Sequence, residues 1–301
     1  MIEALDIASS VVEALDIACW KGPFGDEIVN RAVRALEAGM VLYAPQLSFE
    51  LSESEARLLS ANCLAPQFRN VSYRPGAGAL QGASSEGVER DKLLAMMRRY
   101  YQRVSGLLKS LCPRYVGALS PGFTSYRPAR IDGRATSSRD DDTRLHIDAF
   151  PSRPMKGTRI LRVFTNVNPR MPRSWRVGEP FEQAAARFLP AIRPPLPGSS
   201  ALLRLLRVVK DQRTPYDHFM LQIHDRMKAD QQYQREAPQV TIDFPPGATW
   251  ACFTDSVSHA AMSGQFAFEQ TFHLPVSSMR DPENSPLYIL ERLSGRRLAS
   301  E

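Results

Sequence analysis

Short strand-like segments crowd the second half of the sequence, and they constrain the fold more than any other feature of the chain. Apolar and β-branched runs bounded by Pro and Gly predict strands at residues 158–167, 239–244, 249–253 and 266–274. The earlier part of the chain instead places its apolar residues at helical spacing. Helices first and short strands later predict an α+β protein with a β-sandwich or barrel core.

The N-terminal part is predicted to be mainly helical. Expected helices lie at 26–38, 52–59 and 88–112, and expected strands at 40–45 and 123–127. The longest helix ends before Pro113, and its apolar stripe is predicted to face the core. This part is therefore expected to pack on the strands rather than to bind a ligand.

We expect residues 1–301 to form one domain. Segment 1–120 would pack on the core, segment 121–275 would form the core, and segment 276–301 would be a C-terminal tail. Pro-rich connectors and helical spacing predict a helical insertion at about 170–235, with helices near 179–189, 199–210 and 215–232.

Composition narrows the class of protein. The sequence has no run of about 18 apolar residues and its N-terminus lacks the pattern of a signal peptide, so we expect a cytoplasmic protein. The four cysteines form no CxxC pair, which predicts neither a disulfide framework nor a zinc knuckle. The net charge of +6 is carried mostly by arginine, which suits phosphate or carboxylate partners, although a GC-rich genome produces the same bias. No nucleic-acid reader motif accompanies this charge, so nucleic acid is not expected as a partner.

The tripeptide His146-Ile147-Asp148 places an imidazole and a carboxylate two residues apart. On a strand, this spacing points both side chains to the same face. Together with a distant histidine they would form the 2-His-1-carboxylate set, which holds Fe(II) by three ligands and leaves three positions open. Two open positions can chelate the keto acid 2-oxoglutarate and the third can take O2. The pattern therefore predicts an Fe(II)- and 2-oxoglutarate-dependent oxygenase.

His259 has the context expected of the third ligand, because a Pro-Gly turn and an apolar strand precede it. His218 and His224 lack the i, i+4 spacing that would converge on a metal, and they are expected to be solvated helix positions. His273 is expected to be structural, with a place in the lining of the barrel as the alternative.

The distal carboxylate of 2-oxoglutarate requires a cation, and an arginine fork is the usual solution. Many such oxygenases place it about ten to twelve residues after the distal histidine, but residues 269–271 of this chain include no Arg or Lys. We therefore assign the carboxylate to Arg162, which shares a predicted strand face with Asn166, and keep Arg127 as the alternative. Either arginine could instead cover a sheet edge.

Four stretches of sequence carry a resemblance to a known family. They are residues 145–150, 157–169, 259–265 and 269–272. Through them the chain resembles the 3-deoxy-D-manno-oct-2-ulosonic acid (Kdo) hydroxylases of Gram-negative bacteria, over most of residues 35–293. The resemblance implies a double-stranded β-helix (jelly-roll, cupin-like) core and hydroxylation at C3 of a Kdo sugar of lipopolysaccharide, with 2-oxoglutarate and O2 converted to succinate and CO2. It also implies that Gln270 is normal for this group where other oxygenases keep Arg. Asn166 and Gln270 are therefore expected to bind the cofactor together with Arg162 and Arg127.

The resemblance further implies a Kdo-containing lipopolysaccharide precursor as partner, which suggests contact with the cytoplasmic face of the inner membrane. The apolar and basic segment 202–210 can touch the bilayer, or it can be a core-packed helix with an arginine edge. Two other functions stay open: an oxygenase of the same fold acting on a protein or small metabolite, and a jelly-roll module that binds acidic glycan without catalysis.

Overall fold

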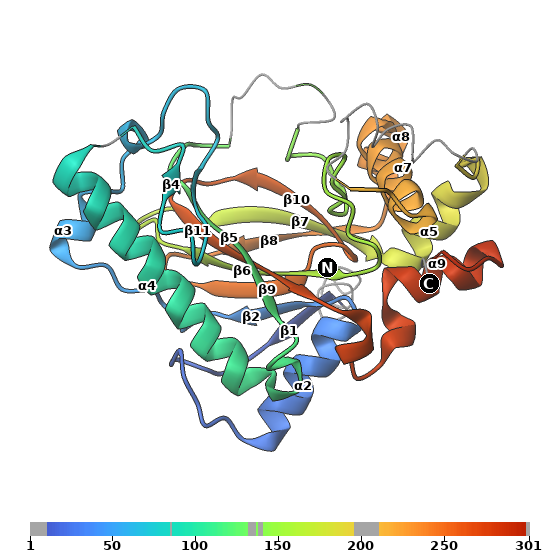
Figure 1. Cartoon of the computed structure of the whole chain (residues 1–301), viewed down its shortest axis with the longest axis horizontal. Coiled ribbons are helices and arrows are strands. Elements are labelled where there is room, and N and C mark those ends of the chain that lie inside the picture. Colours follow the sequence, from blue (N-terminus) through green and yellow to red (C-terminus); the bar gives the residue numbers. More distant parts are fainter. Residues whose placement is uncertain (1–10, 85, 132–136, 138–140, 196–210, 299–301) are drawn as a thin grey trace.

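The structure is a computed structural model that describes residues 11–84, 86–131, 137, 141–195 and 211–298. Its strands are β1 (Val12–Ala14), β2 (Val41–Ala44), β3 (Val71–Tyr73), β4 (Leu80–Gln81), β5 (Ser120–Arg127), β6 (Arg159–Asn166), β7 (Arg173–Pro180), β8 (Gln239–Phe244), β9 (Thr249–Phe253), β10 (Val257–Ser263) and β11 (Ala267–Leu274). They form a large sheet of order β1-β2-β9-β6-β11-β5-β3-β4 and a small sheet of order β10-β7-β8 (Figure 1).

Two groups of helices flank these sheets. The helices are α2 (Asp26–Glu37), α3 (Glu53–Ala56), α4 (Gly87–Leu111), α5 (Phe181–Phe188), α7 (Pro215–Ala229), α8 (Gln231–Glu236) and α9 (Pro286–Ser294). The long helix α4 and helix α2 lie along the large sheet, whereas α5, α7, α8 and α9 gather at the other end of the molecule (Figure 1).

The two sheets together form a jelly roll. The segment around His146 extends the small sheet, because His146 and His259 exchange backbone hydrogen bonds of 3.0 and 2.8 Å at the edge of β10. Four antiparallel neighbours of the large sheet, β5, β11, β6 and β9, provide the facing layer. This is the double-stranded β-helix that the family resemblance implied.

Alternation of side chains gives the large sheet one apolar face. On that face the Tyr100 ring of α4 stacks on Phe268 with ring centroids 4.8 Å apart, and its hydroxyl donates to the Val163 carbonyl. Aromatic rings fill the space between the two sheets, where Phe244 stacks on Trp250 at 3.9 Å. Such rings bury large apolar areas, so they hold both α4 and the small sheet in place.

Most expected elements are found close to their predicted places. The helices at 26–38 and 88–112 correspond to α2 and α4, and the short helix at 52–59 is α3, with a capping box between Ser52 and Glu55. The four cysteines are free, as expected. Within the described ranges, no helix is both long and apolar enough to cross a membrane.

The expected helical insertion at about 170–235 differs from the structure at its start. Residues Arg173–Pro180 form strand β7 at the centre of the small sheet, and only then does helix α5 begin. The alternation of apolar and polar residues in β7 is short, and the strand contains two arginines. Its sequence therefore resembles that of a connecting loop. The helix expected at 199–210 lies outside the described residues, and the one at 215–232 is divided into α7 and α8.

Candidate active site

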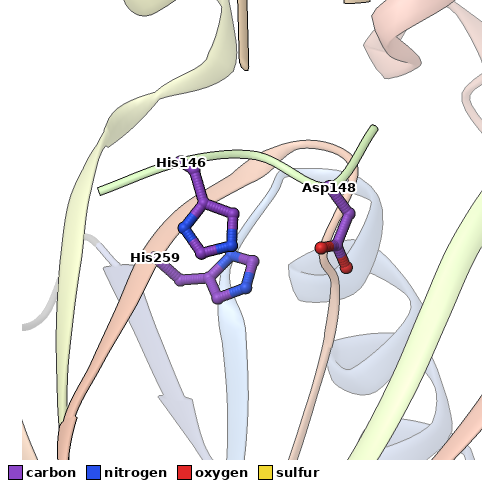
Figure 2. A group of neighbouring side chains, drawn as sticks. All are labelled: His146, Asp148 and His259. Carbon is purple, nitrogen blue, oxygen red and sulfur yellow. The ribbon is translucent and has the colours of Figure 1, made fainter. Parts of the chain in front are cut away.

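The three predicted metal ligands come together beside the small sheet. Figure 2 shows His146 and Asp148 on one segment and His259 on the neighbouring strand, with the two imidazole rings side by side. One ligand atom from each residue lies within 4.8 Å of the others. The Asp148 amide donates to the Thr254 carbonyl at 2.8 Å, which fixes the segment that carries both His146 and Asp148.

Hydrogen bonds of the two imidazoles leave their Nε2 atoms as acceptors. The Nδ1 atom of His146 lies 2.7 Å from the Arg144 carbonyl, and that of His259 lies 2.8 Å from the Val257 carbonyl. Because a carbonyl can only accept, each Nδ1 must carry the proton, and each Nε2 then presents a lone pair. This is the tautomer that a metal-ligating histidine requires.

Burial sets the protonation state of the three residues. It lowers the pKa of both His146 and His259, so both imidazoles are neutral at neutral pH. Burial opposes ionisation of Asp148, yet the adjacent positive charge of Arg162 outweighs this effect and lowers its pKa. Two neutral imidazoles and one carboxylate are the form that binds a divalent metal without first releasing protons.

A ladder of four alternating charges runs from the metal ligands across the large sheet. Arg162 lies 3.1 Å from Asp148 on one side and 3.1 Å from Glu269 on the other, and Glu269 also pairs with Arg127 at 2.6 Å. Burial raises the pKa of Glu269, but the two guanidiniums outweigh it and lower this pKa overall. Both arginines selected from the sequence therefore lie at the site, each already paired with a carboxylate that sequence reasoning missed.

Asn166 and Gln270 do not face this ladder. The Asn166 amide donates to the carbonyls of Met171 and Phe244, which ties down the chain after β6. The Gln270 side chain lies on the apolar face of the large sheet, where it accepts a hydrogen bond from Thr124. Successive residues of a strand point to opposite faces, so Glu269 points to the site and Gln270 points away. The cofactor-binding role expected for Asn166 and Gln270 does not fit this geometry.

Two cavities meet at the ladder. The smaller, of about 80 Å³, is lined by the three candidate ligands together with Arg173 and Trp175, among others. The larger, of about 680 Å³, opens on the other side, and both cavities share Arg127, Arg162 and Glu269 as a common wall. A molecule in the larger cavity would therefore lie next to the metal ligands.

The remaining histidines differ in their surroundings. The expectation that His224 is solvated is wrong, because it is buried and its ring lies 5.6 Å from the ring of His146, with Nδ1 2.9 Å from Asp225. The side of helix α7 that carries His224 faces the small sheet. The sequence of the helix does not indicate this orientation. His218 is half-buried on another side of α7, and His273 lines the larger cavity.

A buried ion pair holds the turn that fixes Asp148. The guanidinium of Arg159 lies 2.7 Å from Asp255 and also donates to Ser256, and both members of the pair are buried. Asp255 and Ser256 belong to the turn between β9 and β10, directly after Thr254, whose carbonyl binds the Asp148 amide. The pair therefore positions a candidate metal ligand from outside the site.

A jelly roll with two histidines and one carboxylate converging beside its small sheet is the arrangement of the non-haem Fe(II) oxygenases as a class. A match to the 3-deoxy-D-manno-oct-2-ulosonic acid (Kdo) hydroxylase family spans residues 20–297, and the chain belongs to this family. No curated protein sequence matches the chain.

Among the solved structures similar to the chain are those of the Kdo hydroxylase KdoO, a non-heme Fe(II) α-ketoglutarate-dependent dioxygenase. Its complex with α-ketoglutarate and Fe(III) is 44% identical, with a TM-score of 0.92 over 96% of this chain and 97% of that one. Its apo form gives 44% identity and a TM-score of 0.93 over the same shares. Its cobalt(II) complex gives 44% and 0.93, over 96% and 98%.

Replacing Asp255 with Asn should destabilise the protein and loosen the metal site. The substitution leaves the buried Arg159 guanidinium without a carboxylate, which costs about 3–5 kcal/mol of unfolding free energy. Affinity for Co(II) should fall by about 10- to 100-fold, as is typical when a residue that orients a ligand is removed. Urea unfolding and Co(II) titration measure the two effects.

Asp281→Asn is the matched control, since its pair with Arg280 is exposed and 3.9 Å long and should contribute about 0–1 kcal/mol. A variant Asp255→Asn with unchanged Co(II) affinity would show that the turn does not position Asp148.

Proposed function

We propose that this protein is an Fe(II)- and 2-oxoglutarate-dependent dioxygenase that hydroxylates C3 of a Kdo sugar in a lipopolysaccharide precursor, giving the 3-hydroxylated sugar Ko with succinate and CO2. The convergence of His146, Asp148 and His259 in their metal-binding protonation states carries the proposal. Membership of the Kdo hydroxylase family and the likeness to KdoO, which was solved with α-ketoglutarate and Fe(III), support the choice of metal, co-substrate and sugar.

In this proposal the Nε2 atoms of His146 and His259 and the Asp148 carboxylate hold Fe(II). Bound Fe(II) would supply the oxidation of the sugar C–H bond, with 2-oxoglutarate and O2 as co-substrates. The backbone pairing of the two histidines sets the spacing of their imidazoles, and Thr254 holds Asp148. Their burial keeps bulk water from the reacting atoms.

We assign the distal carboxylate of 2-oxoglutarate to Arg162, with Arg127 as the alternative. Arg162 is half-buried, lines both cavities, and lies 3.1 Å from the candidate ligand Asp148. Arg127 lies one step further along the ladder, on the far side of Glu269. Two further arginines, Arg69 and Arg173, also line the smaller cavity, and neither was predicted from the sequence.

Substitution of any predicted ligand should abolish activity. Under anaerobic conditions, Fe(II) and 2-oxoglutarate should give wild type the weak visible metal-to-ligand band, and admission of O2 should add one oxygen atom to Kdo-lipid A. His146→Ala, Asp148→Ala and His259→Ala should lose both, because two ligands do not hold the metal in place. His218→Ala, which changes a histidine bonded to the Arg193 carbonyl outside the site, should keep both.

If wild type binds iron but gives no band with 2-oxoglutarate, keto-acid chelation is wrong and a non-catalytic glycan-binding role becomes the better explanation. A band without hydroxylated Kdo points instead to an oxygenase with another substrate.

Replacing Arg162 with Met should weaken 2-oxoglutarate binding. Hydrogen bonds to a charged group contribute about 1.5–3 kcal/mol, so the 2-oxoglutarate concentration for half-maximal band intensity should rise about 10- to 100-fold. Arg127→Met and Arg173→Met are measured alongside, and Co(II) affinity without keto acid separates loss of metal from loss of 2-oxoglutarate. A larger effect in Arg127→Met or Arg173→Met than in Arg162→Met would move the assignment to that residue.

We also propose that the protein acts in the cytoplasm, in peripheral contact with the inner membrane. A lipid-linked sugar stays at the bilayer surface, and a net charge of +6 favours approach to anionic lipid. Co-sedimentation with vesicles containing anionic lipid should capture the protein at low salt and release it as salt is raised, since screening weakens surface attraction. Equal recovery with neutral and anionic vesicles would rule out this mode of contact.

A further inference from the structure

The larger cavity has a polar floor that the metal chemistry does not use. In the large sheet Gln81 of β4 is paired with Ser72 of β3, Ser72 with Ser125 of β5, and Ser125 with Glu269 of β11. All four residues line the cavity, so their side chains form one row across four neighbouring strands. Neighbouring strands lie about 4.8 Å apart, which spaces hydrogen-bonding groups along the row at intervals suited to the hydroxyls of a sugar.

This row begins at the active site and leads away from it. Glu269 is the carboxylate that pairs with Arg162 and Arg127, whereas Gln81 lies at the exposed edge of the sheet. Strands β3 and β4 are additions beyond the jelly-roll strands, and their other face packs Val71 and Leu80 into the core. The added strands therefore extend the floor of the cavity without adding to the metal site.

Three guanidiniums line the cavity, and they differ in their partners. Arg127 and Arg162 both pair with Glu269, and Arg162 also contacts Asp148, so the two positive and two negative charges of the ladder cancel. Arg153 is different. Among the residues that the structure describes, no carboxylate pairs with it, and its guanidinium lies over the Phe123 ring at 5.0 Å from the centroid.

The loop that carries Arg153 is anchored. The amides of Met155 and Lys156 both donate to the Asp217 carboxylate, at 2.6 and 2.9 Å. Asp217 is itself fixed as part of the capping box of α7, with Thr214 as the N-cap. A guanidinium stacked on a ring and mounted on an anchored loop loses little conformational freedom when it binds a ligand.

We propose that Arg153 binds the carboxylate of the substrate's sugar acid, while the row formed by Gln81, Ser72 and Ser125 binds its hydroxyl groups. The planar guanidinium matches a carboxylate with two parallel hydrogen bonds, which a neutral sugar cannot offer. Since the ladder is neutral, Arg153 is the cavity-lining group that makes an acidic sugar preferred over a neutral one. This inference rests on the proposed function, because it assumes that the sugar occupies the cavity beside the metal ligands.

The test compares Kdo-lipid A with a derivative in which the carboxylate of the reacting sugar is converted to a primary amide. Wild type should show a KM for the amide about 10- to 100-fold higher than for the acid. Arg153→Met should raise the KM for the acid by a similar factor and leave the KM for the amide nearly unchanged, so that the preference disappears. Arg153→Lys, which keeps the charge without the planar fork, should recover part of the preference.

Two further variants complete the comparison. Gln81→Ala should raise the KM for acid and amide by the same factor, because it removes a hydroxyl partner and no charge. Arg103→Met, which removes a guanidinium from the exposed side of α4, should leave both values unchanged. If Arg153→Met raises both KM values equally, Arg153 serves another group such as a lipid phosphate, and an unchanged KM for the acid overturns the assignment outright.

The result is separable from a failure of the proposed function. Arg153→Met should keep the anaerobic Fe(II) and 2-oxoglutarate band of wild type, because the Arg153 guanidinium lies over the Phe123 ring and Arg162 is the cation paired with Asp148. If wild type itself neither gives the band nor hydroxylates the sugar, calorimetry with free Kdo decides the question. Weaker binding of Kdo to Arg153→Met than to wild type still supports the carboxylate contact, and equal binding overturns it.

Discussion

The backbone pairing between His146 and His259 is the interaction on which the candidate active site depends. Two hydrogen bonds join segments far apart in the sequence and set the imidazoles side by side. Holding such distant segments together carries an entropic cost, which must be offset by packing elsewhere. The aromatic rings between the sheets offset it on one side, and on the other the buried pair of Arg159 and Asp255 fixes the turn before β10. The geometry of the candidate active site therefore depends on packing throughout the jelly roll.

The charged side chains at the candidate active site are arranged in pairs of opposite sign. Burying an isolated charge is costly, so charges inside proteins are paired. Here the Asp148, Arg162, Glu269 and Arg127 side chains alternate in sign, and each charge has a neighbour of opposite sign within 3.1 Å. The ladder links a candidate metal ligand to the wall of the larger cavity. A ligand that enters either cavity meets a pre-arranged set of charges rather than a group that must first be desolvated.

Features of the fold that depend on a local residue pattern could be predicted from the sequence. Features that depend on which strands pair with one another were harder to predict. Helix α4 and strand β6 follow from residue spacing alone, and His146 and Asp148 share a face because they are two residues apart. Strand β7 and the burial of His224 depend on which other segments of the chain pack against them. The residues of β7 and α7 alone do not identify those neighbours. The side chain of Gln270 points away from the two cavities and that of Glu269 lines them, because adjacent residues of a strand face opposite sides.

Strands β3, β5 and β11 each serve two purposes with alternate residues. Val71, Tyr126 and Phe268 pack under α4, while Ser72, Ser125 and Glu269 line the larger cavity. Substitutions of the cavity-lining residues can change which molecules bind without disturbing the packing of the opposite face against α4. Substitutions on that opposite face can change stability without altering the cavity. A lineage with this architecture can thus diversify its choice of ligand along one set of positions while the other set keeps the chain folded.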